Sequence, residues 1–383
     1  MAGSAENAPT WRSSFPAMGT RVDIIGWGGD GMAIVNAVVG VVARHEDMWS
    51  VFRPSSEVSQ LNAAVRDAAR GDGTSRCGSD STQAGPGLVV SEETDRLLRD
   101  ALALAEATGG AFNPLIGPLV AAWDVKAMRA AYVAGAPLPP APSALAVEEA
   151  LRASSWGLLS RVGERRWAMG IPGESVGGVD APSPSLDLGG IAKGYTADAC
   201  RDLAVTMGAR GVLVSVGTSS VSVFGTRADG SSWRAGLRDP HGGPTSVAGV
   251  VELPAGAMAS LSTSGDNLGP LGGVRAGCAA GPAAGREAGA ASDRRVRETP
   301  CETSADGGRV FDHHIIDPRT GYPAHAGVRQ VSVVASSGVL AEALSTALLV
   351  EPSIDVSDVV ARWARVTGTP ASAKVVGLVR ARS

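Results

Sequence analysis

The order of strand-like and helix-like segments constrains the fold of this 383-residue chain more than any other feature of its sequence. Residues 20–25 (TRVDII) alternate and are β-branched, which predicts a strand, and residues 32–45 then predict a buried helix. Ser91 is a predicted helix N-cap, because Glu92 and Glu93 follow it where the helix dipole favours acidic groups. Further strands are predicted at residues 156–168, 210–224, 328–335 and 373–379, and further helices at 147–153, 339–350 and 356–366. Because strands and helices mix without strict βαβ alternation, the sequence predicts an α+β fold of mixed or antiparallel sheets packed with helices.

Two segments interrupt this pattern because they hold few large apolar side chains. Residues 65–87 are rich in Ala, Gly, Asp and Ser and lack periodicity, and residues 267–308 shift sharply toward Gly, Ala and Arg. Both are predicted to be flexible inserts, since neither segment offers an apolar face to a core. We expect residues 1–14 to form an N-terminal tail and residues 15–383 to form a single domain that contains both inserts.

Composition excludes several classes of protein. The formal net charge is −4, without the basic balance of a nucleic-acid binder, and no run of eighteen apolar residues predicts a membrane span. The N-terminus, MAGSAENAPT, has neither the basic nor the apolar region of a signal peptide, and Cys77 is too late for lipid attachment, so we expect a cytoplasmic protein. The four cysteines form no CxxC pair, which argues against a zinc or dithiol site.

A glycine-rich stretch after the first predicted strand imitates a dinucleotide-binding motif. Gly26, Gly28 and Gly31 fit G-x-G-x-x-G between a strand and a helix. A dinucleotide-binding unit would next need a second parallel strand with an acidic end, and the sequence WSVFRPSSEVSQLN does not supply one. We interpret the stretch as an ordinary strand-to-helix loop.

The segment LDLGGIAKGYTAD, residues 186–198, holds several groups that could bind a ligand. Its diglycine allows backbone to approach a ligand or a metal, and Lys193 lies six residues after Asp187 at the start of a predicted helix. A cation beside the free amides of a helix start suits a phosphate group. The alternative is a capped helix with one solvated lysine.

Three later segments add candidate groups. Residues 260–266 (SLSTSGD) are interpreted as a loop that could face a phosphate, or as an ordinary turn. His313 and His314 precede an Asp-Pro turn, and strand alternation would allow only one of them to face a given site. Glu342 and Thr346 are four residues apart on a predicted helix, so they share a face and could ligate a hard divalent cation. The alternative there is a polar stripe on an apolar helix.

These segments, in this order, resemble the ApbE family of FAD:protein FMN transferases. The resemblance runs from about residue 15 to residue 350 and is carried by FPAMGT, SVFRPSSEVSQLN, TGGAFNPLIGPLVAAWD, LDLGGIAKGYTAD, LVSVG, WRAGLRDP, STSGD, HHIIDPRTGYPA and LAEALSTALLV. It implies an ApbE-like flavin transferase fold with one catalytic domain. It also implies an enzyme that uses Mg²⁺ to transfer FMN from FAD to a threonine of a target flavoprotein, with release of AMP.

The resemblance implies a role for each matching residue. His314 would be the catalytic base, because it matches the histidine that opens the family's HIIDP segment. The residues that would contact FAD are Met18, Phe52, Ala111, Phe112, Asn113, Asp187, Lys193, Thr263 and Ile315. The metal ligands would be Gly190, through its carbonyl, Glu342 and Thr346. Phe52 stands where the family has an aromatic residue that stacks on the flavin ring.

Several positions depart from the family pattern. Asn113 and Glu342 each stand where the family has Asp, and Gly217-Thr218-Ser219 replaces the family's GGD. These departures leave two alternatives beside the transferase: an FAD-binding or storage protein of the same fold, and an FAD pyrophosphatase in which water replaces the threonine.

Overall fold

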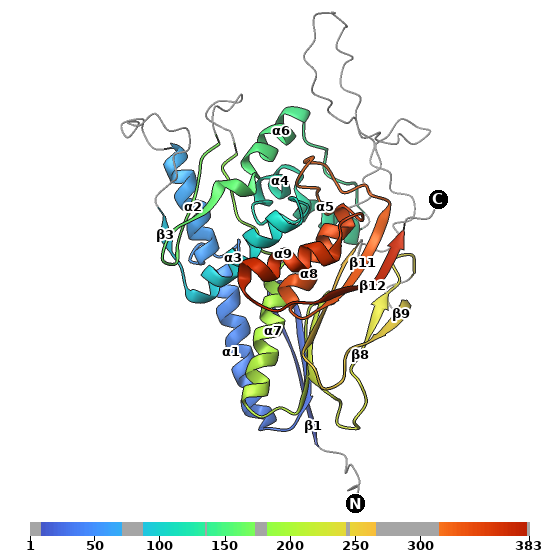
Figure 1. Ribbon diagram of the computed structural model, residues 1–383. Helices are drawn as coiled ribbons and strands as arrows, with labels where there is room; N and C mark the ends of the chain where they lie inside the picture. Colours follow the sequence, from blue (N-terminus) through green and yellow to red (C-terminus); the bar gives the residue numbers. More distant parts are fainter. Residues whose placement is uncertain are drawn as a thin grey trace, which may run out of the picture.

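The computed structural model describes residues 9–70, 87–134, 136–172, 182–242, 246–265 and 314–380. Its main sheet has seven strands in the order β1-β2-β6-β7-β10-β11-β12, and each neighbouring pair is antiparallel (Figure 1). The strands are β1 (Thr10–Ala17), β2 (Thr20–Trp27), β6 (Gly211–Val216), β7 (Ser220–Gly225), β10 (Ala259–Gly265), β11 (Val328–Ala335) and β12 (Ala373–Arg380). Together with the helices, this arrangement confirms the predicted α+β class.

Helices cover one face of this sheet. Figure 1 shows α1 (Gly31–Trp49) and α7 (Ala192–Thr206) side by side along the sheet, and α8 (Gly338–Val350) packs on β10 and β11. Two further helices, α3 (Glu92–Ala107) and α9 (Val356–Thr367), pack against each other, and α3 also contacts α8. The remaining helices are α2 (Glu57–Arg70), α4 (Gly117–Ala122), α5 (Val125–Ala134) and α6 (Ala144–Ala153). A three-stranded sheet has the order β3 (Leu88–Val89), β5 (Arg166–Met169), β4 (Leu159–Gly163), and β8 (Arg234–Arg238) pairs with β9 (Val247–Glu252).

The central strands present unusually polar side chains to the helices. On β7, Val223 packs into a cluster with residues of the β8–β9 hairpin, while Ser220 and Ser222, on the other face, bond to carboxylates from the helices. On β10, Ser260 likewise bonds to a helix carboxylate. These serines are at most 1% exposed, so each buried hydroxyl requires a partner. The packing of sheet and helices therefore requires buried carboxylates in the helices.

Most of the predicted elements are confirmed. Strand β11 spans the predicted residues 328–335, and α8 and α9 each differ from prediction by one residue at an end. Ser91 caps α3, since its hydroxyl accepts a hydrogen bond from the Thr94 amide at 3.2 Å. The glycine-rich loop after β2 is an ordinary strand-to-helix connection, because β2 pairs with β6 in antiparallel fashion rather than in a parallel βαβ unit.

Two predicted boundaries are wrong. Residues 10–14, expected in a tail, belong to β1, where β2 supplies the hydrogen-bonding partner and the Trp11 indole donates to the Gly28 carbonyl at 2.9 Å. Residues 65–70, expected in an insert, continue α2, because Val65 is only 2% exposed and packs in the core. The rest of the first insert, residues 71–86, and the whole second insert, residues 267–308, lie outside the described residues.

Residues 260–265 also differ from expectation. They were predicted as a loop because Ser, Thr and Gly favour turns, and instead they lie in β10 between β7 and β11.

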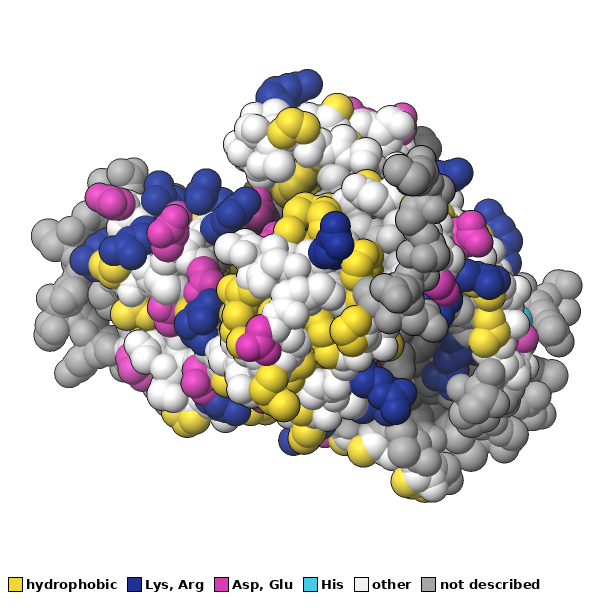
Figure 2. All heavy atoms as spheres, turned by 90° about the horizontal axis from the view of Figure 1, so that it is seen from below, with side chains coloured by type: hydrophobic (Ala, Val, Ile, Leu, Met, Phe, Trp, Pro, Cys, Tyr) yellow, Lys and Arg dark blue, Asp and Glu magenta, His cyan; other side chains and the backbone are white. Residues whose placement is uncertain are grey.

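On the face of the molecule in Figure 2, Lys and Arg side chains are interspersed with Asp and Glu. Among the helices of the described segments, none is long and apolar enough to cross a membrane.

Candidate active site

The segment that leads into α7 is held by two distant parts of the chain. The Asn62 side chain on α2 accepts from the Leu186 amide at 2.7 Å and donates to the Leu186 carbonyl at 3.1 Å. The Asp187 amide donates to the Pro114 carbonyl at 2.9 Å, and the Asp187 carboxylate accepts from the Gly189 amide at 2.8 Å. Asp187 thus shapes the diglycine turn from within, and Asn62 anchors it to α2.

The Glu342 carboxylate caps the start of α7. Glu342 is only 4% exposed; its Oε2 accepts from the Gly194 amide at 2.8 Å, and its Oε1 accepts from the Ser220 hydroxyl. The first amides of a helix have no partner within the helix and carry its positive dipole end. A buried carboxylate at this place therefore gives an unpaired amide an acceptor and places a negative charge at the positive end of the helix dipole.

Lys193 joins the diglycine turn to Glu342. Its Nζ donates to the Gly189 carbonyl at 2.6 Å and lies 3.7 Å from the Glu342 Oε1. The Lys193 side chain is 27% exposed, so one side of the ammonium group remains open to solvent. The fold thus brings together a lysine and a glutamate that the sequence predicted as site residues and that are 149 positions apart.

A group of hydroxyls extends the site along α8. Thr346 is half-buried, and its Oγ1 lies 3.0 Å from the Ser264 Oγ on β10. Thr263 lies on the opposite face of β10, where its Oγ1 is 2.8 Å from the Ser332 Oγ of β11. Because side chains alternate along a strand, the Thr263 side chain points away from Thr346. The structure brings Thr346 to the α8 side of the sheet and does not bring the Thr263 side chain there.

The predicted triplet Ala111, Phe112 and Asn113 is buried beside the diglycine turn. Ala111 is 1% exposed and Phe112 is 4% exposed. A Cβ atom added at Gly190 would lie 3.4 Å from the Phe112 Cε2, so the ring packs against the second glycine. Phe112 therefore supports the backbone that the sequence predicted to carry a metal ligand.

Asn113 uses both ends of its amide within the protein. Its Nδ2 donates to the Ser154 carbonyl at 2.6 Å, and its Oδ1 accepts from the Leu115 amide at 2.8 Å. An aspartate, as in the family pattern, could accept from Leu115 but could not donate to Ser154. The structure thus explains why an amide suits this position.

Met18 and Phe52 occupy different surroundings. Met18 lies in the β1–β2 turn with φ of 51°, and its side chain packs partly against two core clusters. Phe52 is 77% exposed, with the Lys126 Nζ 5.3 Å from its ring centroid. A ring this exposed is available for stacking on a planar ligand.

His314 begins the last described segment. Burial, with a smaller contribution from the positive charge of Arg129, lowers the pKa of His314 to about 4. The imidazole is therefore neutral near pH 7 and able to accept a proton. His314 and Ile315 are both half-buried and lie in bends, so the strand alternation expected for this segment does not hold, and His313 lies outside the described residues.

Sequence reasoning did not identify the ion pairs that follow His314. Arg319 donates to both oxygens of Asp317, at 3.0 and 2.9 Å, and to Glu351 at 3.2 Å. Asp317 is 8% exposed, and Glu351 is the C-cap of α8. Arg319 thus ties the His314 segment to the end of the helix that carries Glu342.

The residues at the start of α7 fit a hard divalent cation. In the described ranges no group of three or more His, Cys, Asp or Glu side chains could hold a metal, so such a site would combine Glu342 with neutral oxygens. The Lys193 ammonium lies between the Gly189 carbonyl and the Glu342 carboxylate. These two oxygen groups therefore already face a positive charge in the structure. Gly190 precedes the N-cap of α7, Ile191, so its carbonyl lies outside the regular hydrogen bonds of the helix. Such a set suits Mg²⁺, which takes few protein oxygens and keeps water and phosphate ligands.

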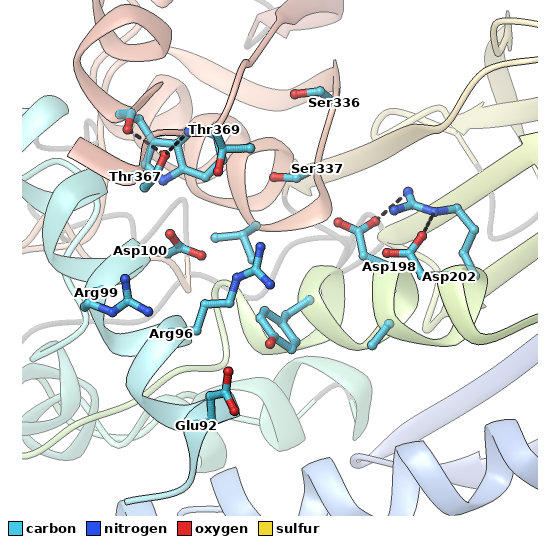
Figure 3. A pocket seen from close by; sticks show the side chains of 15 residues that line it. Glu92, Arg96, Arg99, Asp100, Asp198, Asp202, Ser336, Ser337, Thr367 and Thr369 are labelled. Atoms are coloured by element: carbon cyan, nitrogen blue, oxygen red, sulfur yellow. Dashed lines mark hydrogen bonds and ion pairs between the residues drawn. The ribbon is translucent and has the colours of Figure 1, made fainter. Parts of the chain in front are cut away.

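A separate cavity of about 540 Å³ lies between α3, α7, α9 and the start of α8 (Figure 3). Arg96 and Asp100 of α3 face Asp198 and Asp202 of α7 across it. Burial raises the pKa of Asp100 to about 6. None of the site residues predicted from the sequence lines this cavity, so it is distinct from the candidate active site.

Comparisons with known proteins agree with the resemblance. The model of the ApbE family matches residues 18–292 and 295–367. A Treponema pallidum protein named FAD:protein FMN transferase is 31% identical over 325 residues, covering 83% of this chain and 71% of that protein. A Rhodobacter capsulatus protein of the same name is 28% identical over 350 residues, covering 90% of this chain and 52% of that protein, so the match spans about half of that relative.

Solved structures share the fold. The ApbE protein from Thermotoga maritima superposes with a TM-score of 0.64 at 24% identity, covering 97% of each chain. The flavin transferase ApbE from Vibrio cholerae superposes with a TM-score of 0.61 at 20% identity, covering 98% of this chain and 97% of that one. With the family model matched over nearly the whole sequence and a relative 31% identical, this chain belongs to the ApbE family.

Proposed function

We propose that this chain transfers FMN from FAD to a threonine hydroxyl of an acceptor flavoprotein, with the help of Mg²⁺ and with release of AMP. The names of the Treponema, Rhodobacter and Vibrio relatives support flavin transfer. The observation that carries the proposal is the convergence of Lys193, Glu342 and the diglycine turn at the N-terminus of α7.

The N-terminus of α7 suits a pyrophosphate. The Lys193 ammonium, on a side chain that is 27% exposed, attracts anionic oxygens at the start of α7, and a transferred phosphoryl group needs its charge neutralised and its position fixed. Phe112 packs under the turn and keeps its backbone in place. In this proposal Lys193 holds the pyrophosphate of FAD, and exposed Phe52 offers a face to the flavin ring.

Glu342, Thr346 and the Gly190 carbonyl would hold Mg²⁺. The ion, when bound, supplies neutralisation of the pyrophosphate charge and polarisation of its oxygens. Glu342 is one methylene longer than the family's Asp, and its two hydrogen bonds, from Gly194 and Ser220, hold the longer arm in place. These bonds favour a retained metal site over a degenerate one.

His314 accepts the proton of the attacking threonine hydroxyl in this proposal. A hydroxyl is a poor nucleophile until a base takes its proton, and the neutral His314 imidazole has a ring nitrogen that can accept it. The threonine oxygen then bonds to the phosphorus on the FMN side of FAD, and the bond from that phosphorus to the bridging oxygen breaks. AMP leaves with the bridging oxygen, so atoms and charge balance.

The test uses the full chain with FAD, Mg²⁺ and the acceptor flavoprotein of the Vibrio cholerae relative. Flavin fluorescence on the denatured acceptor, together with AMP release that requires the acceptor, is the expected result. AMP release without an acceptor would identify a pyrophosphatase instead. Tight FAD binding with neither product would identify a flavin-binding protein.

A further inference from the structure

Helices α7 and α8 cross in direct backbone contact. At the crossing, Gly194 of α7 faces Gly338 of α8, and a Cβ atom added to either glycine would collide with the backbone of the other. Only glycine allows two helices to approach this closely. Any residue that fixes this crossing also fixes the side chains one turn further along each helix.

Two carboxylates reach across the crossing in opposite directions. Glu342, four residues after Gly338 on α8, accepts from the Gly194 amide of α7 at 2.8 Å. Asp198, four residues after Gly194 on α7, accepts from the Gly338 amide of α8 at 2.6 Å. Each helix thus caps the start of the other, one helical turn from the glycine contact, and the two caps form a reciprocal pair.

Strand β7 of the main sheet binds both of these carboxylates. On β7, Ser220 donates to Glu342, and Ser222, two residues on and on the same face, donates to Asp198 at 2.6 Å. Asp198 also accepts from the Ser260 hydroxyl of β10 at 2.6 Å. Asp198 therefore ties α7 to β7, to β10 and to the start of α8.

A buried cation completes the environment of Asp198. Arg201, which is 3% exposed, donates to Asp198 at 2.9 Å and to Asp202 at 2.8 Å. Figure 3 shows Asp198 and Asp202 next to each other on α7, at the wall of the cavity. Asp198 faces the sheet and α8 through its other bonds, whereas the Asp202 side chain is 52% exposed.

We infer that Asp198 is a positioning residue for the metal ligand Glu342. It acts through the Gly338 amide: by fixing the first turn of α8 against α7, it sets the Glu342 carboxylate beside Lys193 and the Gly194 amide. The inference rests on the proposed function, because it assumes that Glu342 ligates Mg²⁺. Sequence reasoning gave Asp198 no role.

The test compares Asp198→Asn with the matched control Asp202→Asn. Both substitutions keep the side-chain volume and remove one carboxylate from Arg201, but only the first replaces an acceptor of Gly338 and β7 by an amide that carries a donor. The readout is Mn²⁺ binding, counted by electron paramagnetic resonance, to the full chain without FAD. No turnover contributes to this measurement.

We expect Asp198→Asn to raise the Mn²⁺ dissociation constant about 10-fold, as is typical when an outer partner of a metal ligand is lost. Asp202→Asn is expected to match the unsubstituted chain. FAD affinity, measured separately by quenching of flavin fluorescence, is expected to stay within about 2-fold in both variants, since Asp198 acts on Glu342 through the Gly338 amide and not on FAD.

Glu342→Ala separates the two ways in which the inference can fail. If Glu342→Ala leaves Mn²⁺ binding unchanged, the metal site of the proposed function is wrong and the inference falls with it. If Glu342→Ala abolishes Mn²⁺ binding while Asp198→Asn binds Mn²⁺ as well as Asp202→Asn does, only the positioning role is overturned.

Should Asp198→Asn not fold, Ser222→Ala removes one hydrogen bond to Asp198, and it is also expected to weaken Mn²⁺ binding. Unchanged binding in that variant would overturn the inference.

Discussion

Replacing Glu342 by Gln separates its structural role from its proposed chemical role. The Gln carbonyl can accept from the Gly194 amide, and the Ser220 hydroxyl can turn to accept from the Gln amide, so no buried group is orphaned. Hydrogen bonds to a charged acceptor contribute about 1.5–3 kcal/mol and neutral ones about 1 kcal/mol. For two bonds we expect the free energy of unfolding to fall by about 1–4 kcal/mol.

The effect on metal binding is expected to be larger. Glu342→Gln removes the one carboxylate among the proposed ligands, and Lys193 loses the anion 3.7 Å from its Nζ. Loss of an outer partner typically costs about 10–100-fold in metal affinity, so loss of the anionic ligand itself should cost at least about 100-fold. Glu342→Asp keeps the charge and is the matched control, expected to retain metal dependence.

Urea unfolding gives the first quantity, and a Mg²⁺ titration of FMN transfer gives the second. We expect a stable Glu342→Gln variant whose transfer rate stays low at Mg²⁺ concentrations that saturate the unsubstituted chain. An unchanged Mg²⁺ curve for Glu342→Gln would refute the assignment of Glu342 as a ligand. A fully unfolded variant would show that the two hydrogen bonds contribute far more than estimated.

Two further predictions concern His314 and Asn113. The folded pKa of His314 is about 4, so between about pH 6.5 and 4 only the unfolded chain takes up a proton at this residue. The free energy of unfolding therefore falls as the pH decreases through that window, by about 1.6 kcal/mol from pH 6.5 to 5. Urea unfolding at pH 6.5 and pH 5 should show a smaller loss of stability in His314→Gln than in the unsubstituted chain. His45, whose pKa is also lowered, is present in both proteins and contributes equally to both. Equal losses in the two proteins would contradict a lowered pKa at His314. Asn113→Asp places a carboxylate against the Ser154 carbonyl and is expected to lower the free energy of unfolding at pH 7 by about 1–3 kcal/mol. An unchanged free energy would mean that this donor is not needed.

The C-terminal part of the fold was predictable from local pattern. Strand β11 and helices α8 and α9 carry long apolar or amphipathic runs with clear caps, such as Asp355, whose side chain accepts from the first amides of α9. Helix α2 carried the same kind of signal: Val58, Leu61 and Val65 recur at helical spacing and are all buried. No helix was predicted at residues 57–70, because the Ala- and Asp-rich end of this segment weakens the pattern, and residues 65–70 were expected in an insert.

Strand β10 could not be predicted from its own residues. Its serines favour turns when they are exposed, and here they are buried because partners distant in sequence satisfy them: Asp198 for Ser260 and Ser345 for Ser262. The same holds for β1, whose polar residues form a strand because β2 pairs with them. Long-range partners, which local propensity does not contain, decide both elements.

Some residues of the candidate site could be predicted from local sequence, and others could not. Lys193 and Glu342 were identified through their motifs, and the structure places them together. Asn62 and Asp198 gave no local signal, because each acts through one backbone group far away in the sequence, at Leu186 and Gly338. Residues of this kind are visible only once the fold has brought the segments together.

Mass spectrometry of the acceptor shows whether this chain joins FMN to a threonine of another protein. The full chain is incubated with FAD, Mg²⁺ and the acceptor flavoprotein of the Vibrio cholerae relative, and released AMP is counted in the same sample. We expect an acceptor heavier by FMN less one water, with the added mass on a threonine and one AMP released for each acceptor modified. A parallel reaction with Lys193→Ala should be strongly slowed, since the pyrophosphate loses its cation. An acceptor of unchanged mass, alongside AMP release at the full rate, would show that this chain cleaves FAD without transferring FMN.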